Sequence, residues 1–168
     1  MIVDDSISIR TCVRNLLYSL QAEILEVKNG LQGLEIANSQ HLDLIITDVE
    51  MPGMDGFELC RTLKKAKFTS DIPVVILSSR ESDSDIEKGF KVGAGAYVGK
   101  SNGKDNLLPR VQSILGKYLM RGKHVMIVDD SSFILKTLSR GMIQNGFRVS
   151  NAKMGKKRLL LCNRSLQT

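Results

Sequence analysis

The chain alternates short apolar segments with amphipathic helical patterns, and this alternation restricts its fold more than any other feature. Segments with strand character lie at 1–3, 23–27, 42–47, 73–77 and 96–98. Each is followed by a segment with apolar residues at helical spacing; the first is capped by Ser6. The run PVVIL at 73–77 is apolar throughout, which is typical of a strand covered by helices on both faces. Strict alternation therefore predicts an α/β fold, a doubly wound five-stranded parallel sheet.

The start of the chain recurs further along it. MIVDDS occupies residues 1–6 and again 126–131, an offset of 125 residues. At the same offset, Lys28, Gly30, Leu34 and Asn38 recur as Lys153, Gly155, Leu159 and Asn163. We therefore predict a complete domain over 1–118, a linker over 119–123 and an incomplete second copy over 124–168. Since the second copy breaks off early, we expect its end to be partly disordered and the sequence to be a fragment or a shortened gene model.

The basic charge of the chain belongs to its last part. The net charge is +6, yet residues 1–118 hold 14 Lys and Arg against 16 Asp and Glu. Residues 119–168 hold 10 basic and 2 acidic residues. The basic cluster over 153–164 falls where the second copy should form its second helix, without interleaved aromatic residues or a DNA-binding motif. The sequence therefore does not favour nucleic-acid binding.

The sequence also bears on location. No apolar run reaches the roughly 18 residues that a membrane span needs, and the N-terminus does not resemble a signal peptide. The cysteines Cys12, Cys60 and Cys162 are scattered, as in proteins of a reducing compartment. We expect a cytoplasmic protein that does not enter membranes.

Polar side chains follow four of the five predicted strands. Asp4 and Asp5 come after the first, Asp48 after the third, Ser78 ends the fourth and Lys100 follows the fifth. The carboxyl ends of these strands meet at one edge of the sheet, where three carboxylates would repel one another unless a cation lay among them. Mg²⁺, or Mn²⁺ in its place, suits such oxygen ligands. A carboxylate beside it can attack a phosphoryl donor while a hydroxyl and an ammonium group stabilise the charge.

These residues lie in motifs that resemble the receiver domain of two-component response regulators. The motifs are IVDDS at 2–6, IITDVEMPGMDG at 45–56, PVVILSS at 73–79 and GAYVGK at 95–100, and together they span nearly all of residues 1–118. The resemblance implies a flavodoxin-like fold and a phosphoryl-accepting switch rather than a turnover enzyme. It also implies a sensor histidine kinase or phosphotransfer protein as partner, and a homodimer through the fourth helix, fifth strand and fifth helix.

The resemblance also assigns roles to single residues. Asp48 is the phosphoacceptor, and Mg²⁺ is held by Asp4, Asp5, Asp48 and the backbone carbonyl of Glu50. Ser78 and Lys100 bind the phosphoryl group, and Tyr97 is the aromatic residue that turns inward in the switch.

Some positions depart from the family pattern or remain open. Ser101 follows Lys100 where the family usually has proline, which puts the path of the next loop and the signalling face in doubt. Glu50 and Arg80, each two residues beyond a site residue, could pair across the site and slow hydrolysis of the phosphate. The second acidic pair, Asp129 and Asp130, has no acceptor to serve.

Two other functions compete with the switch. An aspartate-nucleophile phosphatase would need a second aspartate two residues after Asp48, but Glu50 stands there. A silent adaptor or dimerisation module is the other alternative, and it fits the second copy better than the first.

Overall fold

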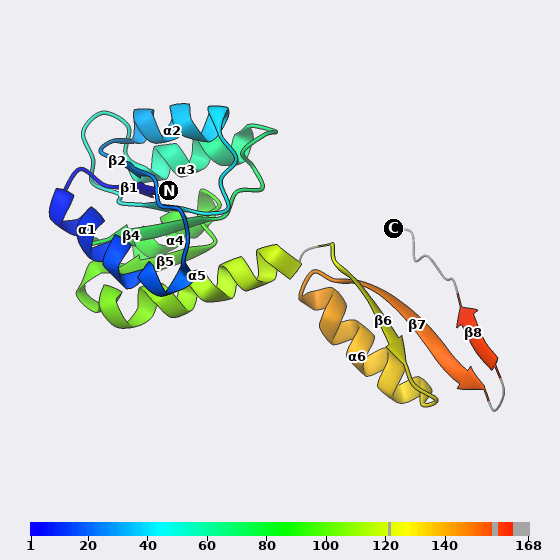
Figure 1. The fold of residues 1–168 in the computed structure, drawn as a ribbon. Helices are drawn as coiled ribbons and strands as arrows, with labels where there is room; N and C mark the ends of the chain where they lie inside the picture. The colour runs from blue at the N-terminus through cyan, green and yellow to red at the C-terminus, as the bar shows by residue number, and fades with distance from the viewer. Residues whose placement is uncertain (121, 156–157, 163–168) are drawn as a thin grey trace. The chain divides into compact units, whose positions relative to one another are not determined.

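The computed structural model describes residues 1–120, 122–155 and 158–162, which fall into two compact units. The first unit is Met1–Leu115 and the second begins at Gly116. In the first, five parallel strands lie in the order β2-β1-β3-β4-β5 (Figure 1). The strands are β1 Ile2–Val3, β2 Glu26–Val27, β3 Ile45–Thr47, β4 Val74–Ser78 and β5 Ala96–Gly99. The helices are α1 Ile7–Leu16, α2 Gly30–Ser39, α3 Gly56–Lys65, α4 Asp83–Lys91 and α5 Gly103–Met120, with short 3₁₀ turns η1 Tyr18–Leu20 and η2 Lys100–Asn102.

The sheet has a hydrophobic core on each face. Successive strand residues point to opposite faces, so Val3, Ile45 and Val74 pack in one core while their neighbours pack in the other. Figure 1 shows α2 and α3 on one side of the sheet and α1 and α5 on the other. Burial on both faces explains why the strand segments read as continuous apolar runs. The predicted doubly wound parallel sheet is confirmed.

Polar caps begin the helices close to the ends of the strands. The side chains of Ser6, Asn29, Asp55 and Ser82 each accept a hydrogen bond from the backbone N–H three residues further on. The predicted cap at Ser6 is therefore present, with its hydroxyl accepting from the N–H of Ile9 at 3.4 Å. These caps fix where each strand gives way to its helix, and so they fix the edge of the sheet at which polar residues gather.

The second unit begins with the same order of elements as the first, a strand, a helix and a parallel strand. Its elements are β6 His124–Val128, α6 Ser132–Gln144, β7 Arg148–Gly155 and β8 Arg158–Cys162. Strand β6 pairs with β7 in parallel, and Ile127 and Val128 have Asn151 and Ala152 as partners. The pairs in the first unit are Ile2 with Glu26 and Val3 with Val27, which is the same register at the offset of 125. Ser131 caps α6 as Ser6 caps α1.

The repeat ends after β7. Arg158–Cys162 forms strand β8, antiparallel to β7, where a helix equivalent to α2 was expected. Strand β7 continues through Gly155, the counterpart of the first residue of α2, and β8 pairs with it in antiparallel. Helix α5 also runs to Met120, so the first two residues of the predicted linker are helical. The expected disordered end over 163–168 lies outside the described residues.

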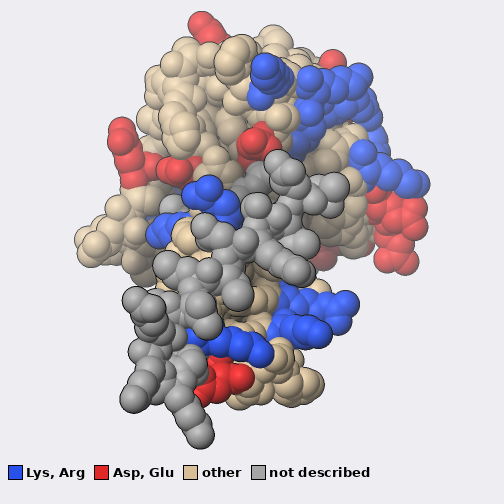
Figure 2. Space-filling view, turned by 90° about the vertical axis from the view of Figure 1, so that its right-hand side faces the viewer, with Lys and Arg blue, Asp and Glu red and all other residues tan. Residues whose placement is uncertain are grey.

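The described surface carries charges of both signs. Figure 2 shows basic side chains in several groups on one face, with acidic side chains among them. Within the described ranges, none of the helices is long and apolar enough to cross a membrane.

Candidate functional site

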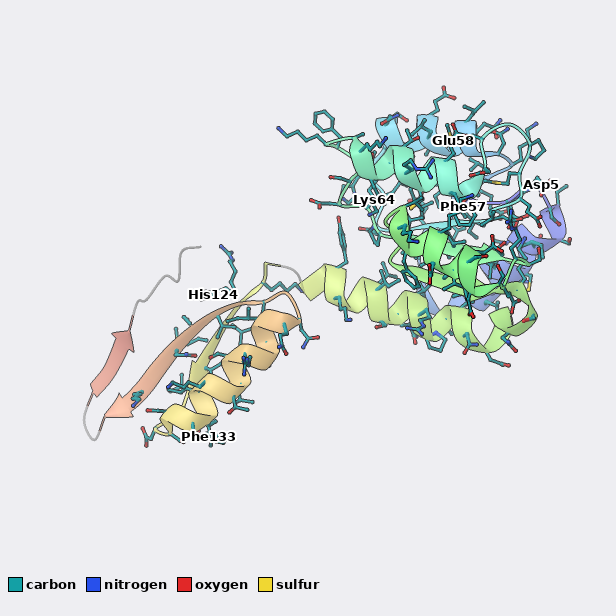
Figure 3. All side chains as sticks on the ribbon, turned by 180° about the vertical axis from the view of Figure 1, so that it is seen from behind. Asp5, Phe57, Glu58, Lys64, His124 and Phe133 are labelled. Carbon is teal, nitrogen blue, oxygen red and sulfur yellow. The ribbon has the colours of Figure 1, made fainter. Side chains whose placement is uncertain are left out.

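Three carboxylates meet at the carboxyl ends of β1 and β3. These strands pair with Val3 beside Thr47, which brings Asp4 and Asp48 side by side just beyond them. One carboxylate oxygen from each of Asp4, Asp5 and Asp48 lies within 4.8 Å of the others. Asp4 and Asp48 are 2% and 5% exposed, whereas Asp5 is exposed and lies at the margin of the unit (Figure 3). Among the described residues, this is the one group of three or more such side chains with metal-ligand spacing.

Lys100 brings a positive charge to the two buried carboxylates. Its Nζ lies 2.7 Å from Oδ2 of Asp48 and 3.0 Å from Oδ2 of Asp4. Burial alone would lower the pKa of Lys100, but its bonds to Asp48 and Asp4 outweigh burial and raise the pKa above its ordinary value. Lys100 is therefore charged at neutral pH, and it contacts Asp4 and Asp48, which lie far from it in the sequence.

The Asp48 carboxyl group remains poorly compensated despite this contact. Burial raises its pKa above the ordinary value, and the nearby Asp4 charge adds to the effect. The hydrogen bond and charge of Lys100 lower the pKa, as does the N–H of Val49, but they do not cancel the effect of burial. A further cation at the cluster would favour the ionised carboxylate.

Backbone groups orient the buried carboxylates. The N–H of Val49 donates to Oδ1 of Asp48 at 2.7 Å, and the N–H of Ser6 donates to Oδ1 of Asp4 at 2.8 Å. The other oxygen of each carboxylate faces Lys100. The loop after Asp48 then turns back so tightly that a Cβ at Gly56 would lie 1.9 Å from the Asp48 carbonyl oxygen. Glycine at position 56 is thus required for the shape of this loop.

Ser78 and Tyr97 occupy the neighbouring strand ends. Ser78 is fully buried at the end of β4, and its hydroxyl accepts the N–H of Arg80 at 3.1 Å. The Tyr97 ring packs against the backbone of α4, where a Cβ at Gly89 would lie 2.7 Å from the ring. The Tyr97 hydroxyl donates to the carbonyl of Arg80, and burial raises the pKa of Tyr97. Both residues therefore contact the loop that follows β4.

One expectation about side chains differs from the structure. Arg80 forms an ion pair with Asp85 at 2.6 Å, and Glu50 accepts a hydrogen bond from Ser79 at 3.0 Å. Within the described part of the chain no ion pair joins Glu50 to Arg80, because each has a nearer partner. On α3, the Lys64 ammonium group is bound to backbone carbonyls. Lys64, labelled in Figure 3, donates to the carbonyls of Ser70 and Ile72 at 2.9 and 2.6 Å. These bonds close the loop after α3.

Arg10 is a site residue that the sequence did not reveal. From α1 its Nη1 donates to the Asp4 carbonyl at 2.7 Å, and its Nε lies 3.4 Å from Glu26. The arginine thereby holds the turn that presents Asp4 and Asp5. A basic residue six positions after an aspartate has no spacing signal of its own, so only the fold shows this contact.

The second acidic pair repeats part of this arrangement. Oδ1 of Asp129 accepts the N–H of Ser131 at 2.7 Å, as Asp4 does with Ser6. The neighbouring Asp130 is exposed. Across the described residues of the second unit, no counterpart of Asp48, Ser78 or Lys100 joins the pair.

Comparison with known proteins agrees with this geometry. A parallel sheet with three carboxylates and a lysine at its carboxyl edge defines the receiver class of signalling domain. Residues 1–112 match the family model of the response regulator receiver domain, and the chain belongs to this family.

Similar proteins include whole regulators and isolated receiver domains. The chain is 29% identical over 154 residues to the uncharacterised transcriptional regulatory protein YclJ of Bacillus subtilis, covering 90% of this chain and 66% of that protein. It is 31% identical over 134 residues to the heme response regulator HssR of Staphylococcus haemolyticus, covering 80% and 58%. The chain thus spans less than two thirds of the length of these curated relatives.

Solved structures show the same fold. Chemotaxis protein CheY4 of Vibrio cholerae has a TM-score of 0.62 and 32% identity, covering 67% of this chain and 94% of its own. The BeF3-activated DrrB receiver domain has a TM-score of 0.61 and 29% identity, covering 68% and 93%. The first unit is therefore a receiver domain in sequence and in fold.

Proposed function

We propose that the first unit is a phosphoryl-accepting switch of a two-component phosphorelay, with Asp48 as the acceptor. The observation that carries this proposal is the cluster of Asp4, Asp5 and Asp48 with the Lys100 ammonium between its two buried members. The raised pKa of Asp48 adds support, because burial disfavours its charged form and a cation bound beside it would favour that form. A site built for a divalent cation and a phosphoryl group meets this need.

The donor set fits Mg²⁺, with Mn²⁺ as a substitute. Asp4, Asp5 and Asp48 offer hard oxygen ligands, and the backbone carbonyl of Glu50 is proposed as a further one. When bound, the ion neutralises the cluster and supplies positive charge to the equatorial phosphoryl oxygens. All three positions of the cluster carry aspartate, so three carboxylates are available to the ion.

The reaction follows from the positions of the side chains. A carboxylate oxygen of Asp48 attacks the phosphorus of a phosphohistidine, the P–N bond breaks, and the imidazole nitrogen takes up a proton. Lys100 moves from a carboxylate oxygen to a phosphoryl oxygen, which keeps its charge paired. Ser78 donates its hydroxyl hydrogen to another oxygen of the new acyl phosphate. The product adds about −1.5 to −2 charges at pH 7, which pulls on Ser78, Lys100 and the loops they begin.

The proposed partners follow from this chemistry. A sensor histidine kinase or a phosphotransfer protein supplies the phosphoryl group in the cytoplasm. The switch then acts on the surface of α4, β5 and α5, through which we propose homodimerisation. Phe90 on α4 is 53% exposed, and the Tyr97 ring on β5 packs against α4 at Gly89. We further propose that Glu50 and Arg80 tune the phosphate lifetime through their separate partners, Ser79 and Asp85.

The second unit supports a different role. Among the described residues no acceptor carboxylate joins its acidic pair, Asp129 and Asp130, and we propose a silent binding or dimerisation role for this unit.

Intact mass after incubation with acetyl phosphate and Mg²⁺ tests the proposal. Wild type should gain one phosphoryl group, and Asp48→Ala or wild type in EDTA should gain none. Equal masses for wild type and Asp48→Ala would reject Asp48 as the acceptor. Steady turnover of a generic phosphate ester would instead favour the phosphatase alternative.

A further inference from the structure

A carboxylate from the loop after β4 holds the turn that follows Lys100. Oε1 of Glu81 accepts the N–H of Ser101 at 3.1 Å, and Oε2 accepts the Ser101 hydroxyl at 2.8 Å. One side chain thus satisfies both donors of Ser101, the middle residue of the η2 turn. The same bonds hold the pKa of Glu81 below its ordinary value, so the carboxylate is charged at neutral pH.

The space for this contact is made by Gly99. A Cβ on Gly99 would lie 2.2 Å from the carboxyl carbon of Glu81 and 2.4 Å from its Oε1. Gly99 is also the strand partner of Ser78 in the pairing of β4 with β5. The Glu81 carboxylate therefore lies beside Gly99, the last residue of β5, which pairs with Ser78 and directly precedes Lys100.

The loop that carries Glu81 is itself tied to the site. Ser79 donates to Glu50 at 3.0 Å, the N–H of Arg80 donates to Ser78, and the Arg80 carbonyl accepts the Tyr97 hydroxyl. The Glu81–Ser101 contact is the link from this loop to the residue that follows Lys100. A change at Ser78 can therefore reach Lys100 through the Glu81 side chain as well as through the strand pair of Ser78 with Gly99.

We propose that Glu81 and Ser101 form a latch that positions Lys100 relative to Ser78 for phosphoryl transfer to Asp48. The inference rests on the proposed function, and it assigns positioning roles to two residues outside the acidic cluster. The latch fixes the η2 turn and holds the Lys100 ammonium over Asp48 before the phosphoryl donor arrives, so less rearrangement is needed during the transfer. Both latch residues are exposed, so the contact is weak enough to open when the switch changes state.

The latch depends on the identity of residue 101. A proline there would have neither the N–H nor the hydroxyl, so both hydrogen bonds to Glu81 would be lost. Serine at this position departs from the family pattern of proline, and it supplies both donors.

Phosphorylation kinetics of the full chain test the latch. We expect Glu81→Ala and Ser101→Pro to lower the second-order rate constant for acetyl phosphate about three- to tenfold, the effect of losing one or two modest hydrogen bonds. Ser101→Ala, which keeps the N–H, should lose less. The Mg²⁺ dissociation constant, measured by calorimetry, should not rise, because the proposed ligands follow β1 and β3 and do not contact the latch.

Matched variants separate positioning from general damage. Glu87→Ala removes an exposed acid of α4 that pairs with Lys91 on the surface, and it should behave as wild type. Ser101→Thr keeps both donors and should restore the rate. The effects of Glu81→Ala and Ser101→Ala should not add in the double variant, because each removes the same hydroxyl contact. Circular dichroism checks that each variant is folded. If Ser101→Pro does not fold, Ser101→Ala tests the latch.

The outcomes distinguish the two proposals. A wild type that gains no phosphoryl group overturns the proposed function and the latch with it. A phosphorylated wild type with an unchanged or faster Glu81→Ala overturns the latch alone. A fall in Mg²⁺ affinity that matches the fall in rate would also overturn it, since the effect would then act on the acidic cluster.

Discussion

Replacing Lys100 by methionine should destabilise the protein and at the same time strengthen its response to Mg²⁺. Methionine keeps the length of the side chain but leaves Asp4 and Asp48 buried without their shared cation. The two contacts, at 2.7 and 3.0 Å, would each be worth about 5 to 6 kcal/mol of gross attraction at an effective dielectric constant of about 20. Desolvation cancels most of that gain, and breaking a buried pair typically costs about 3 to 5 kcal/mol.

The exposure of the three side chains sets the expected value. Counting side-chain atoms alone, the aspartates are 3% and 6% exposed, but Lys100 is 20% exposed, so water can partly replace the lost ammonium. We therefore expect a loss of about 2 to 3 kcal/mol in the free energy of unfolding in EDTA at pH 7. Mg²⁺ should return more stability to Lys100→Met than to wild type. A tenfold gain in Mg²⁺ affinity, for example, would add about 1.4 kcal/mol at saturating ion.

Urea unfolding followed by circular dichroism, with EDTA or with MgCl₂, measures both effects. Lys91→Met is the matched control, because Lys91 pairs with Glu87 on the surface, at side-chain exposures of 77% and 69%. It should change the free energy of unfolding by less than about 0.5 kcal/mol. A loss below about 0.5 kcal/mol in Lys100→Met would refute the reasoning, as would a smaller Mg²⁺ effect than in wild type. Either result would mean that Lys100 does not compensate the cluster.

Three further predictions concern the frame around the site. Gly56→Ala should lower the free energy of unfolding in urea by at least about 2 kcal/mol and slow phosphorylation, because its Cβ would meet the Asp48 carbonyl oxygen at 1.9 Å. Gly116→Ala, with open space around it, should be neutral or slightly stabilising. In a Cys162→Ser background at pH 8, a thiol reagent should label Cys12 but reach Cys60 only on unfolding, because burial raises the Cys60 pKa to about 11. Rapid labelling of both cysteines in the folded protein would contradict this. The stability difference between wild type and Asp85→Asn should be constant from neutral pH down to about 4.5 and shrink below the ordinary pKa of 3.8. Ser82 and Arg80 lower the Asp85 pKa, and their contribution is lost as the folded carboxylate is protonated. A difference that persists at acid pH would exclude an ionic origin.

Local sequence patterns predicted the first unit well because its local and long-range preferences agree. The apolar runs became buried strands, Ser6 became a cap, and the strand ends placed Asp4, Asp48 and Lys100 in contact. Topology alone brings these residues together once the strand order is known. The side-chain partners of the surface loops were not predictable in the same way. Arg80 could reach Glu50 or Asp85, and only the path of the loop after β4 decides for Asp85.

The second unit shows where repetition stops being informative. At the offset of 125, the register of β6 and β7 and the cap at Ser131 reproduce the first unit, because short-range signals determine them. Gly155 and Leu159 match residues of α2, yet Leu159 lies in β8. In the first unit, Gly30 packs against Met54, a contact from a later part of the domain. The helix is therefore supported by residues that have no counterpart in the described second unit.

The central claim is that Asp48 carries the phosphoryl group, and chemical trapping tests it most directly. The full chain is incubated with acetyl phosphate and Mg²⁺, the acyl phosphate is reduced with borohydride, and the modified residue is located by peptide mass spectrometry. We predict homoserine at position 48, and unmodified aspartate at positions 4, 5, 129 and 130. A reduced residue at any of those four positions, or none at position 48 in a chain that has gained a phosphoryl group, would contradict the account.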